Sequence, residues 1–209
     1  MLDDERRAVA RRAADLADRT PGRSGNLSVR SGDRFAVTPT GVAYAGLESD
    51  DVPVVGLDGE RLAGALAPSS ETPMHAAIYR ELGPGAVVHA HAPWATALAA
   101  LRRPVPPVHY ALARAGGRVP VADYATYGSD ALAANVVSAM AGADTTACLL
   151  ANHGVVATGD DLDAAIGTLD AVEFTAQVFA RAASVGEPVE LPADELDRVA
   201  ERFASYGQD

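Results

Sequence analysis

The chain has 209 residues, of which 48% are hydrophobic and 22% charged, so residues 1–209 fit a single soluble domain with a sizeable core. Its formal net charge is -11 and it has no block rich in basic residues, which argues against nucleic acid and anionic membranes as partners. All 17 basic residues are arginine. Chemistry that needs a lysine amine, such as Schiff-base formation, is therefore excluded.

The first part of the chain predicts short elements separated by turns. Residues 2–19 combine alanine and charge with apolar residues at helical spacing, which indicates a surface helix. Residues 26–30 and 34–38 read as two short strands, and residues 39–50 as a loop. Residues 52–62 predict a hairpin around an Asp-Gly turn.

From residue 72 onwards, apolar residues recur with the period of an α-helix in some segments and with the two-residue period of a β-strand in others. In chain order we predict a helix over 72–82, a strand over 86–92, a helix over 94–101, short strands near 108–110 and 118–121, a helix over 129–141, strands over 146–151 and 155–159, and helices over 161–184 and 192–204. Helices mixed with short, hairpin-linked strands favour an α/β sandwich whose sheet is largely antiparallel.

Features that would mark another compartment are missing from the sequence. Cys148 is the single cysteine, so no disulfide can form within the chain, and we expect it to be a buried apolar residue. The first residues are charged and lack an apolar signal region, and no segment reaches the length of a membrane span. We therefore expect a cytoplasmic protein.

Three of the five histidines suggest a metal site. His89 and His91 alternate along a predicted strand, so both project to one face, about 7 Å apart along the backbone. Two satisfied core histidines are the alternative reading. His153 follows the apolar segment TACLLA and precedes Gly154, where a buried strand ends. Three neutral imidazoles are a recognised catalytic zinc set that leaves one coordination position open.

The other two histidines carry no such pattern. His75 lies within a predicted helix, where we expect a surface or core-edge role. His109 stands in a proline-rich connector, and we expect it to be structural.

Three short segments contain small or hydroxyl-bearing residues. They are Ser24-Gly25-Asn26, Thr38-Pro39-Thr40-Gly41 and Pro68-Ser69-Ser70-Glu71. Each one alone is more simply an ordinary turn. Together they offer backbone N–H groups and short hydroxyls without bulk, as a phosphate cradle requires, and Ser69 and Ser70 precede a predicted helix.

Taken in order, these segments resemble the class II aldolase/adducin family. The likeness runs over residues 5–206 through SGNLSVR, VTPTG, PSSE, VVHAHAPWATALA, HY, YATYGS and NHGVVATG. Within the family it is greatest to enzymes that act on fuculose 1-phosphate. The resemblance implies a three-layer α/β/α sandwich around a mostly antiparallel sheet. It also implies a metal-dependent aldolase that cleaves a ketose 1-phosphate into dihydroxyacetone phosphate and an aldehyde.

The resemblance also implies roles for individual residues. One divalent ion per subunit, Zn²⁺ or else Mn²⁺ or Co²⁺, would be held by His89, His91 and His153, with Glu71 at the metal as general acid or base. The substrate phosphate would be bound by small-residue loops, here Asn26, Thr40, Gly41, Ser69 and Ser70. Tyr110 and Tyr206 would act as further catalytic residues, Tyr110 as a proton donor in a neighbouring subunit's site. Family members are typically homotetramers with sites between subunits.

Some residues depart from the family pattern. Arg23 stands where threonine is common, Thr72, Pro73 and Met74 replace bulkier residues, and Tyr127 replaces another aromatic. Apart from Arg23, these changes fall where the aldehyde end of a substrate would lie, so they weaken the case for fuculose 1-phosphate itself.

Other functions stay open on sequence alone. Sister enzymes of the family include a pentulose-5-phosphate 4-epimerase, a phosphotetronate decarboxylase and a methylthioribulose-1-phosphate dehydratase; glutamate rather than aspartate at position 71 favours the aldolase over the epimerase. A non-catalytic, adducin-like interaction domain would not need the three histidines. A zinc hydrolase would leave the serine- and threonine-containing loops without a role.

Overall fold

The computed structural model describes residues 1–20 and 24–203. Within them the helices are α1 (Asp3–Ala13), η1 (Ala14–Asp18), η2 (Ser49–Asp51), α2 (Thr72–Glu81), α3 (Pro93–Ala100), η3 (Tyr110–Ala115), α4 (Asp130–Ala143), α5 (Leu162–Ala183) and α6 (Ala193–Phe203), where η marks a 3-10 helix. The strands are β1 (Asn26–Ser31), β2 (Arg34–Val37), β3 (Val54–Gly56), β4 (Arg61–Ala63), β5 (Ala86–Ala90), β6 (Val121–Ala122), β7 (Ala147–Leu150) and β8 (Gly154–Gly159).

The strands form one eight-stranded sheet in the order β4-β3-β2-β1-β5-β8-β7-β6. All neighbours pair antiparallel except β6 and β7, which are parallel. The predicted largely antiparallel sheet is therefore confirmed. In β5, the strand that holds the His-x-His motif, His89 pairs with Asn26 of β1 on one side and with Val156 of β8 on the other.

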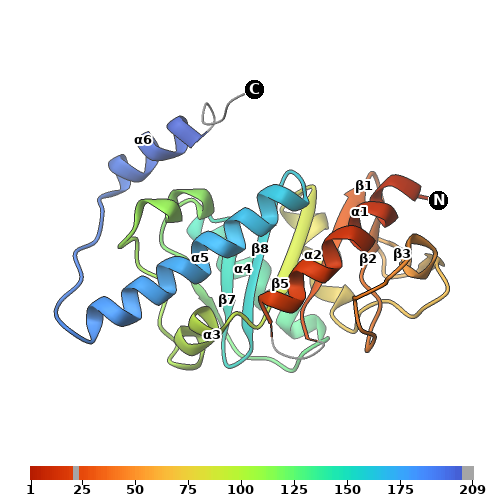
Figure 1. Cartoon of the computed structure of the whole chain (residues 1–209), viewed down its shortest axis with the longest axis horizontal. Coiled ribbons are helices and arrows are strands. Elements are labelled where there is room, and N and C mark those ends of the chain that lie inside the picture. Colours follow the sequence, from red (N-terminus) through yellow and green to blue (C-terminus); the bar gives the residue numbers. More distant parts are fainter. Residues whose placement is uncertain (21–23, 204–209) are drawn as a thin grey trace.

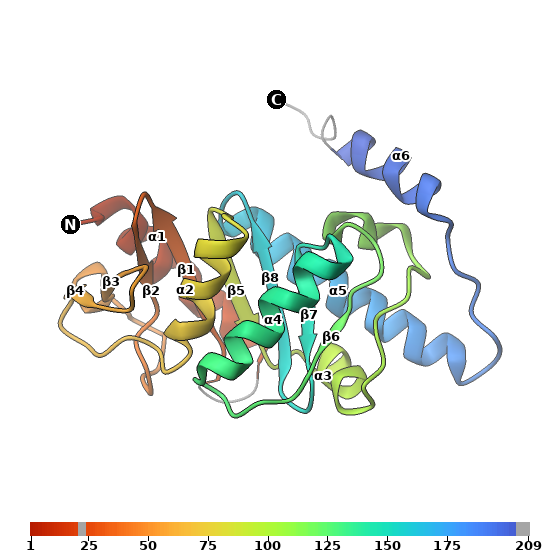
Figure 2. The same cartoon turned by 180° about the vertical axis from the view of Figure 1, so that it is seen from behind.

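Helices cover both faces of the sheet, which makes the predicted three layers. α1 and α5 lie on the face turned to the viewer in Figure 1, and α2 and α4 lie on the opposite face, seen in Figure 2. Two apolar clusters fill the spaces between the layers. Along β5, Val88 faces the α5 side and Val87 the α2 side. Since side chains alternate on a strand, His89 faces α2.

The N-terminal helix and the connector before η3 differ from the sequence prediction. The N-terminal helix ends at Ala13 and continues as the short η1. The strand expected near residues 108–110 is absent from the described structure, because the 3-10 helix η3 begins at Tyr110 instead. The imidazole of His109 accepts a hydrogen bond from the Ala111 amide (3.2 Å) and so caps η3, which accords with its expected structural role.

The C-terminal helix α6 lies outside the three layers, at the end of an extended segment that follows α5, and packs against η3 (Figure 1). Over the residues that the structure describes, no helix has the length and apolar character needed to cross a lipid bilayer.

Candidate active site

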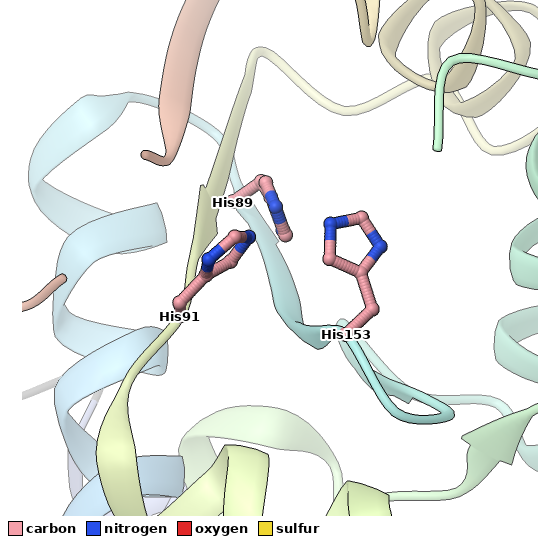
Figure 3. Close-up of side chains that lie close together, drawn as sticks. All are labelled: His89, His91 and His153. Carbon is pink, nitrogen blue, oxygen red and sulfur yellow. The ribbon is translucent and has the colours of Figure 1, made fainter. Parts of the chain in front are cut away.

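The three histidines of the predicted metal set converge at the end of β5. The ring centroids of His89 and His91 are 5.1 Å apart, and His153 lies 4.8 Å from His89 and 5.0 Å from His91. Figure 3 shows the three rings turned toward one another from β5 and from the turn that precedes β8. β5 itself ends at Ala90, so His91 lies just beyond the strand and not within it as predicted.

The NHG segment owes its composition to the turn between β7 and β8. Asn152 adopts a left-handed backbone conformation (φ 54°), which asparagine tolerates better than most residues. The following His153 donates its backbone N–H to the carbonyl of Leu150 (3.0 Å). Gly154 then packs directly against the backbone of β5, so this turn delivers His153 to the other two rings.

Glu71 completes the cluster from the opposite side. It is the N-cap residue of α2 and is 5% exposed. Its Oε2 lies 3.1 Å from His89 Nε2, and its Oε1 lies 3.4 Å from His153 Nε2. Asn26 donates a hydrogen bond to Oε2 (2.8 Å). The structure therefore brings together all four residues that the sequence assigned to the metal.

The hydrogen bonding of His89 determines which ring nitrogen faces the cluster. Its Nδ1 lies 2.9 Å from the carbonyl of Val155, which can only accept, so Nδ1 carries the hydrogen. In the neutral ring Nε2 then presents a bare lone pair. Among the described residues, neither this buried Nε2 nor Glu71 Oε1 has a hydrogen-bond partner. His89 Nε2 faces Glu71 Oε2, and two buried electron-rich atoms in such contact need a cation or a proton between them.

The charges of the cluster suit a metal. Burial disfavours the Glu71 carboxylate, but attraction by His89 and the hydrogen bond from Asn26 outweigh it and hold the Glu71 pKa well below its usual value. Burial and repulsion by His89 lower the pKa of His91, and they lower that of His153 to about 4. At neutral pH Glu71 is therefore an anion and His91 and His153 are neutral, the forms in which these residues bind metals, whereas attraction by Glu71 outweighs burial and raises the pKa of His89.

The donor set can also be judged as a metal site. Within the described part of the chain, His89, His91 and His153 each offer one nitrogen, and these atoms lie within 4.8 Å of one another. Three imidazoles with a carboxylate at the open side match a catalytic zinc site better than a structural one, which would normally close with four protein ligands. The residues present thus fit a divalent ion, and they also suit Mn²⁺ or Co²⁺.

A cavity of about 360 Å³ opens beside the cluster. Glu71, His91 and His153 form part of its wall, and much of the remainder comes from the three small-residue segments, namely Ser24, Gly25, Asn26, Pro39, Thr40, Gly41, Ser69 and Ser70. Backbone hydrogen bonds between Thr40 and Ala67 and between Ser69 and Thr38 join two of these segments. Turns that are distant in sequence therefore meet around one space next to the histidines.

Two of the predicted residues have contacts that the sequence did not suggest. Asn26, expected to bind phosphate, lines the cavity but uses its side chain to link Glu71 and His75. Tyr110 is 51% exposed, stacks on His109 and does not line the cavity. The two remaining predicted positions, Tyr206 and Arg23, lie outside the described residues.

Sequence reasoning misjudged His75 and overlooked two tyrosines. His75 is completely buried, so the expected surface or core-edge role was wrong. Tyr44 lines the cavity and donates its hydroxyl to the Gly25 carbonyl (2.7 Å), and Tyr124 also contributes to the wall. Nothing in the loop over residues 39–50 distinguishes Tyr44. The i, i+4 spacing of Glu71, His75 and Tyr79 could have indicated that all three share one helix face.

Comparison with known proteins agrees with this geometry. Residues 5–180 match the model of the class II aldolase and adducin N-terminal domain family, and the chain belongs to this family. A 5-methylthioribulose-1-phosphate/5-deoxyribulose-1-phosphate aldolase of Rhodospirillum rubrum is 45% identical over 188 residues, which cover 89% of this chain and 84% of that protein. A 5-deoxy-D-ribulose 1-phosphate aldolase of Bacillus thuringiensis is 38% identical, with 90% and 89% covered.

Solved structures give the same result. The chain is similar to an L-fuculose 1-phosphate aldolase structure with a TM-score of 0.91 and 39% identity, and the match covers 96% of both chains. The L-fuculose phosphate aldolase of Escherichia coli K12 is 37% identical in sequence, over 89% of this chain and 86% of that protein. These relatives are named aldolases, and the fold predicted from the resemblance is confirmed.

Proposed function

We propose that the protein is a zinc-dependent aldolase that cleaves a ketose 1-phosphate between C3 and C4 into dihydroxyacetone phosphate and an aldehyde. The observation that carries the proposal is the meeting of His89, His91, His153 and Glu71 at one wall of a cavity whose other wall consists of small-residue turns. The names of the relatives support the same reaction class.

The metal would be held by His89, His91 and His153, with Glu71 next to it. When bound, zinc supplies Lewis-acid polarisation of substrate oxygens, which here takes over the electron-withdrawing role of a lysine imine. Glu71 carries a proton to and from C3 of the three-carbon fragment. Its Oε1 suits this step, because Oε2 already accepts a hydrogen bond from Asn26.

The phosphate would lie against the small-residue turns. Thr40, Gly41, Ser69 and Ser70 line the cavity. Gly41 has a positive φ of 70°, and a β-carbon there would meet nothing within 4 Å, so glycine suits this turn by its backbone conformation and adds no bulk to the cavity wall. Binding at these turns fixes the substrate at a point remote from the bond that breaks, which contributes orientation. The second N–H of Asn26 can serve the same phosphate.

The oligomer is part of the proposal. Tyr110 is exposed and separate from the cavity of its own chain, as expected of a residue that serves a neighbouring subunit. We propose a homotetramer with sites between subunits, in which Tyr110 donates a proton to the aldehyde oxygen and Tyr206 joins the same site. Mixing inactive Tyr110→Phe subunits with inactive Glu71→Gln subunits should then restore activity. At some interfaces the intact Glu71 of one subunit would meet the intact Tyr110 of its neighbour.

The test of the reaction is direct. Zinc-loaded protein is incubated with 5-deoxy-D-ribulose 1-phosphate, 5-methylthioribulose 1-phosphate and L-fuculose 1-phosphate, and the products are identified. We expect dihydroxyacetone phosphate with acetaldehyde, (methylthio)acetaldehyde or lactaldehyde respectively. The relatives' names favour the first two substrates over the third. An epimer, a dehydrated product or carbon dioxide would instead assign one of the sister reactions, and no turnover of any phosphate would favour a non-catalytic domain.

A further inference from the structure

A series of five buried polar side chains leads from the cavity into the core. Asn26 donates to Glu71 (2.8 Å), His75 Nε2 lies 2.6 Å from Asn26 Oδ1, Ser28 Oγ lies 2.6 Å from His75 Nδ1, and the Tyr79 hydroxyl lies 2.7 Å from Ser28 Oγ. None of the five is more than 5% exposed. This buried series links the carboxylate at the active site to the interior.

The series follows from matched repeats in two elements. Glu71, His75 and Tyr79 are four residues apart on α2, which spans about 6 Å per step. Asn26 and Ser28 are two residues apart on β1, which spans about 6.6 Å. Because the two spacings nearly coincide, the side chains of the helix and of the strand can interleave as donor and acceptor.

The direction of each hydrogen bond follows from the carboxylate. Ionised Glu71 can only accept, so the Asn26 amide nitrogen faces it and the Asn26 carbonyl oxygen faces His75. That oxygen also only accepts, so His75 carries its hydrogen on Nε2. Nδ1 of the neutral ring then accepts from Ser28, whose oxygen accepts from Tyr79. Burial keeps this ring neutral, since it lowers the His75 pKa to about 3.

We propose that His75 is a positioning residue for Glu71, which it fixes through the side-chain amide of Asn26. This inference rests on the proposed aldolase function, in which Glu71 moves a proton. With the His75 N–H in place, the amide cannot turn its oxygen toward the carboxylate. Without the His75 N–H, the Asn26 amide loses its one fixed orientation. Glu71 then loses the donor that holds Oε2 in place while Oε1 transfers the proton.

The kinetic test compares three variants of the zinc-loaded protein. His75→Leu removes the N–H, His75→Gln keeps an N–H donor at a similar distance from the backbone, and Tyr79→Phe removes a buried hydroxyl from the far end of the same series. For His75→Leu we expect kcat to fall about 10–100-fold with full zinc content and a KM within about threefold. His75→Gln should recover most of kcat. Tyr79→Phe should keep the wild-type kcat while lowering the midpoint of thermal unfolding about as much as His75→Leu does.

The second readout does not depend on turnover. In zinc-loaded protein labelled with ¹⁵N in histidine, the His75 signals, assigned from their loss in His75→Gln, should report a neutral ring with hydrogen on Nε2 at pH 7. The Nδ1–H form would overturn the inference. So would a folded His75→Leu with kcat within twofold of wild type, or a Tyr79→Phe that loses kcat as severely. If His75→Leu does not fold, the kcat of His75→Gln against Ser28→Ala and the ¹⁵N spectrum decide. Wild-type protein that cleaves no ketose phosphate would instead contradict the proposed function.

Discussion

Gly154 lies against His91 with no room for a side chain. A β-carbon on Gly154 would fall 2.5 Å from the Ala90 carbonyl oxygen, 3.0 Å from the His91 ring and 3.2 Å from the His89 ring. The backbone contact cannot be relieved by a rotamer change, since the oxygen belongs to the central strand β5. Glycine is therefore required at this position by the packing of β8 against the histidines, independently of any backbone angle.

Gly154→Ala should therefore disrupt the metal site. We expect β5 and the turn before β8 to separate slightly, which displaces His89 and His91 and lowers the zinc content below one ion per chain. Zinc analysis of purified protein, with circular dichroism to verify folding, measures this. Gly142→Ala is the matched control, since a β-carbon there meets nothing within 4 Å and alanine favours the helix α4. Full zinc occupancy in Gly154→Ala would contradict the expectation.

Glu71→Gln should separate metal binding from proton transfer. The amide has nearly the same shape, but it cannot carry a proton between substrate atoms. We expect kcat for ketose phosphate cleavage to fall about 10²–10⁴-fold while the three imidazoles retain zinc. Steady-state kinetics with parallel zinc analysis measures both. The control is Glu81→Gln at the other end of α2, where the side chain is exposed. Unchanged turnover in Glu71→Gln would remove Glu71 from the mechanism.

Tyr110→Phe should affect one half of the reaction more than the other. If the hydroxyl donates to the aldehyde oxygen, its loss slows cleavage and synthesis. Exchange of the C3 proton of dihydroxyacetone phosphate with solvent does not involve the aldehyde and should persist. Deuterium incorporation followed by mass spectrometry, beside cleavage rates, compares the two steps within one protein. An equal loss of both would show that Tyr110 does more than serve the aldehyde.

His75 should make folding stability fall as the pH falls. The unfolded chain protonates this ring below about pH 6.5, whereas the folded protein keeps it neutral down to a pKa of about 3. The unfolded state thus binds more protons in that interval, and stability drops toward acid by up to about 1.4 kcal/mol per pH unit. Urea unfolding of wild type and His75→Gln at pH 7 and pH 5 tests this, since other titrating groups cancel in the difference. The difference in unfolding free energy between wild type and His75→Gln should be smaller at pH 5 than at pH 7. An equal difference at both pH values would refute the lowered pKa of His75.

The sequence predicted the residues of the site better than their surroundings. Alternation along a strand places His89 and His91 on one face, and although β5 ends at Ala90 the chain stays extended enough for the rings to meet. The position of His153 followed from its place at a strand end. These are local features, and a sequence records local features directly.

What the sequence did not predict depends on contacts between distant segments. His75 was assigned to a surface or core-edge position because an isolated helix gives no sign of how many of its faces are covered. In the structure α2 packs on the sheet and beside α4, and residues 74–79 are all buried. Tyr44 reaches the cavity only because its loop folds back to the Gly25 carbonyl. Similarly, the proline-rich connector before Tyr110 gives way to a 3-10 helix that His109 caps, which apolar residues alone do not signal.

The sheet order brings three distant parts of the chain together at the metal site. β5 comes from the middle of the sequence and β8 from its last third, yet they are neighbours, and the N-terminus of α2 closes the site from a third segment. A bound ion would therefore cross-link three stretches that only meet once the centre of the sheet has formed. Removing it should loosen the middle of the molecule before its edges, so amide hydrogens at the β5–β8 junction should exchange faster with deuterated solvent in chelator-treated protein.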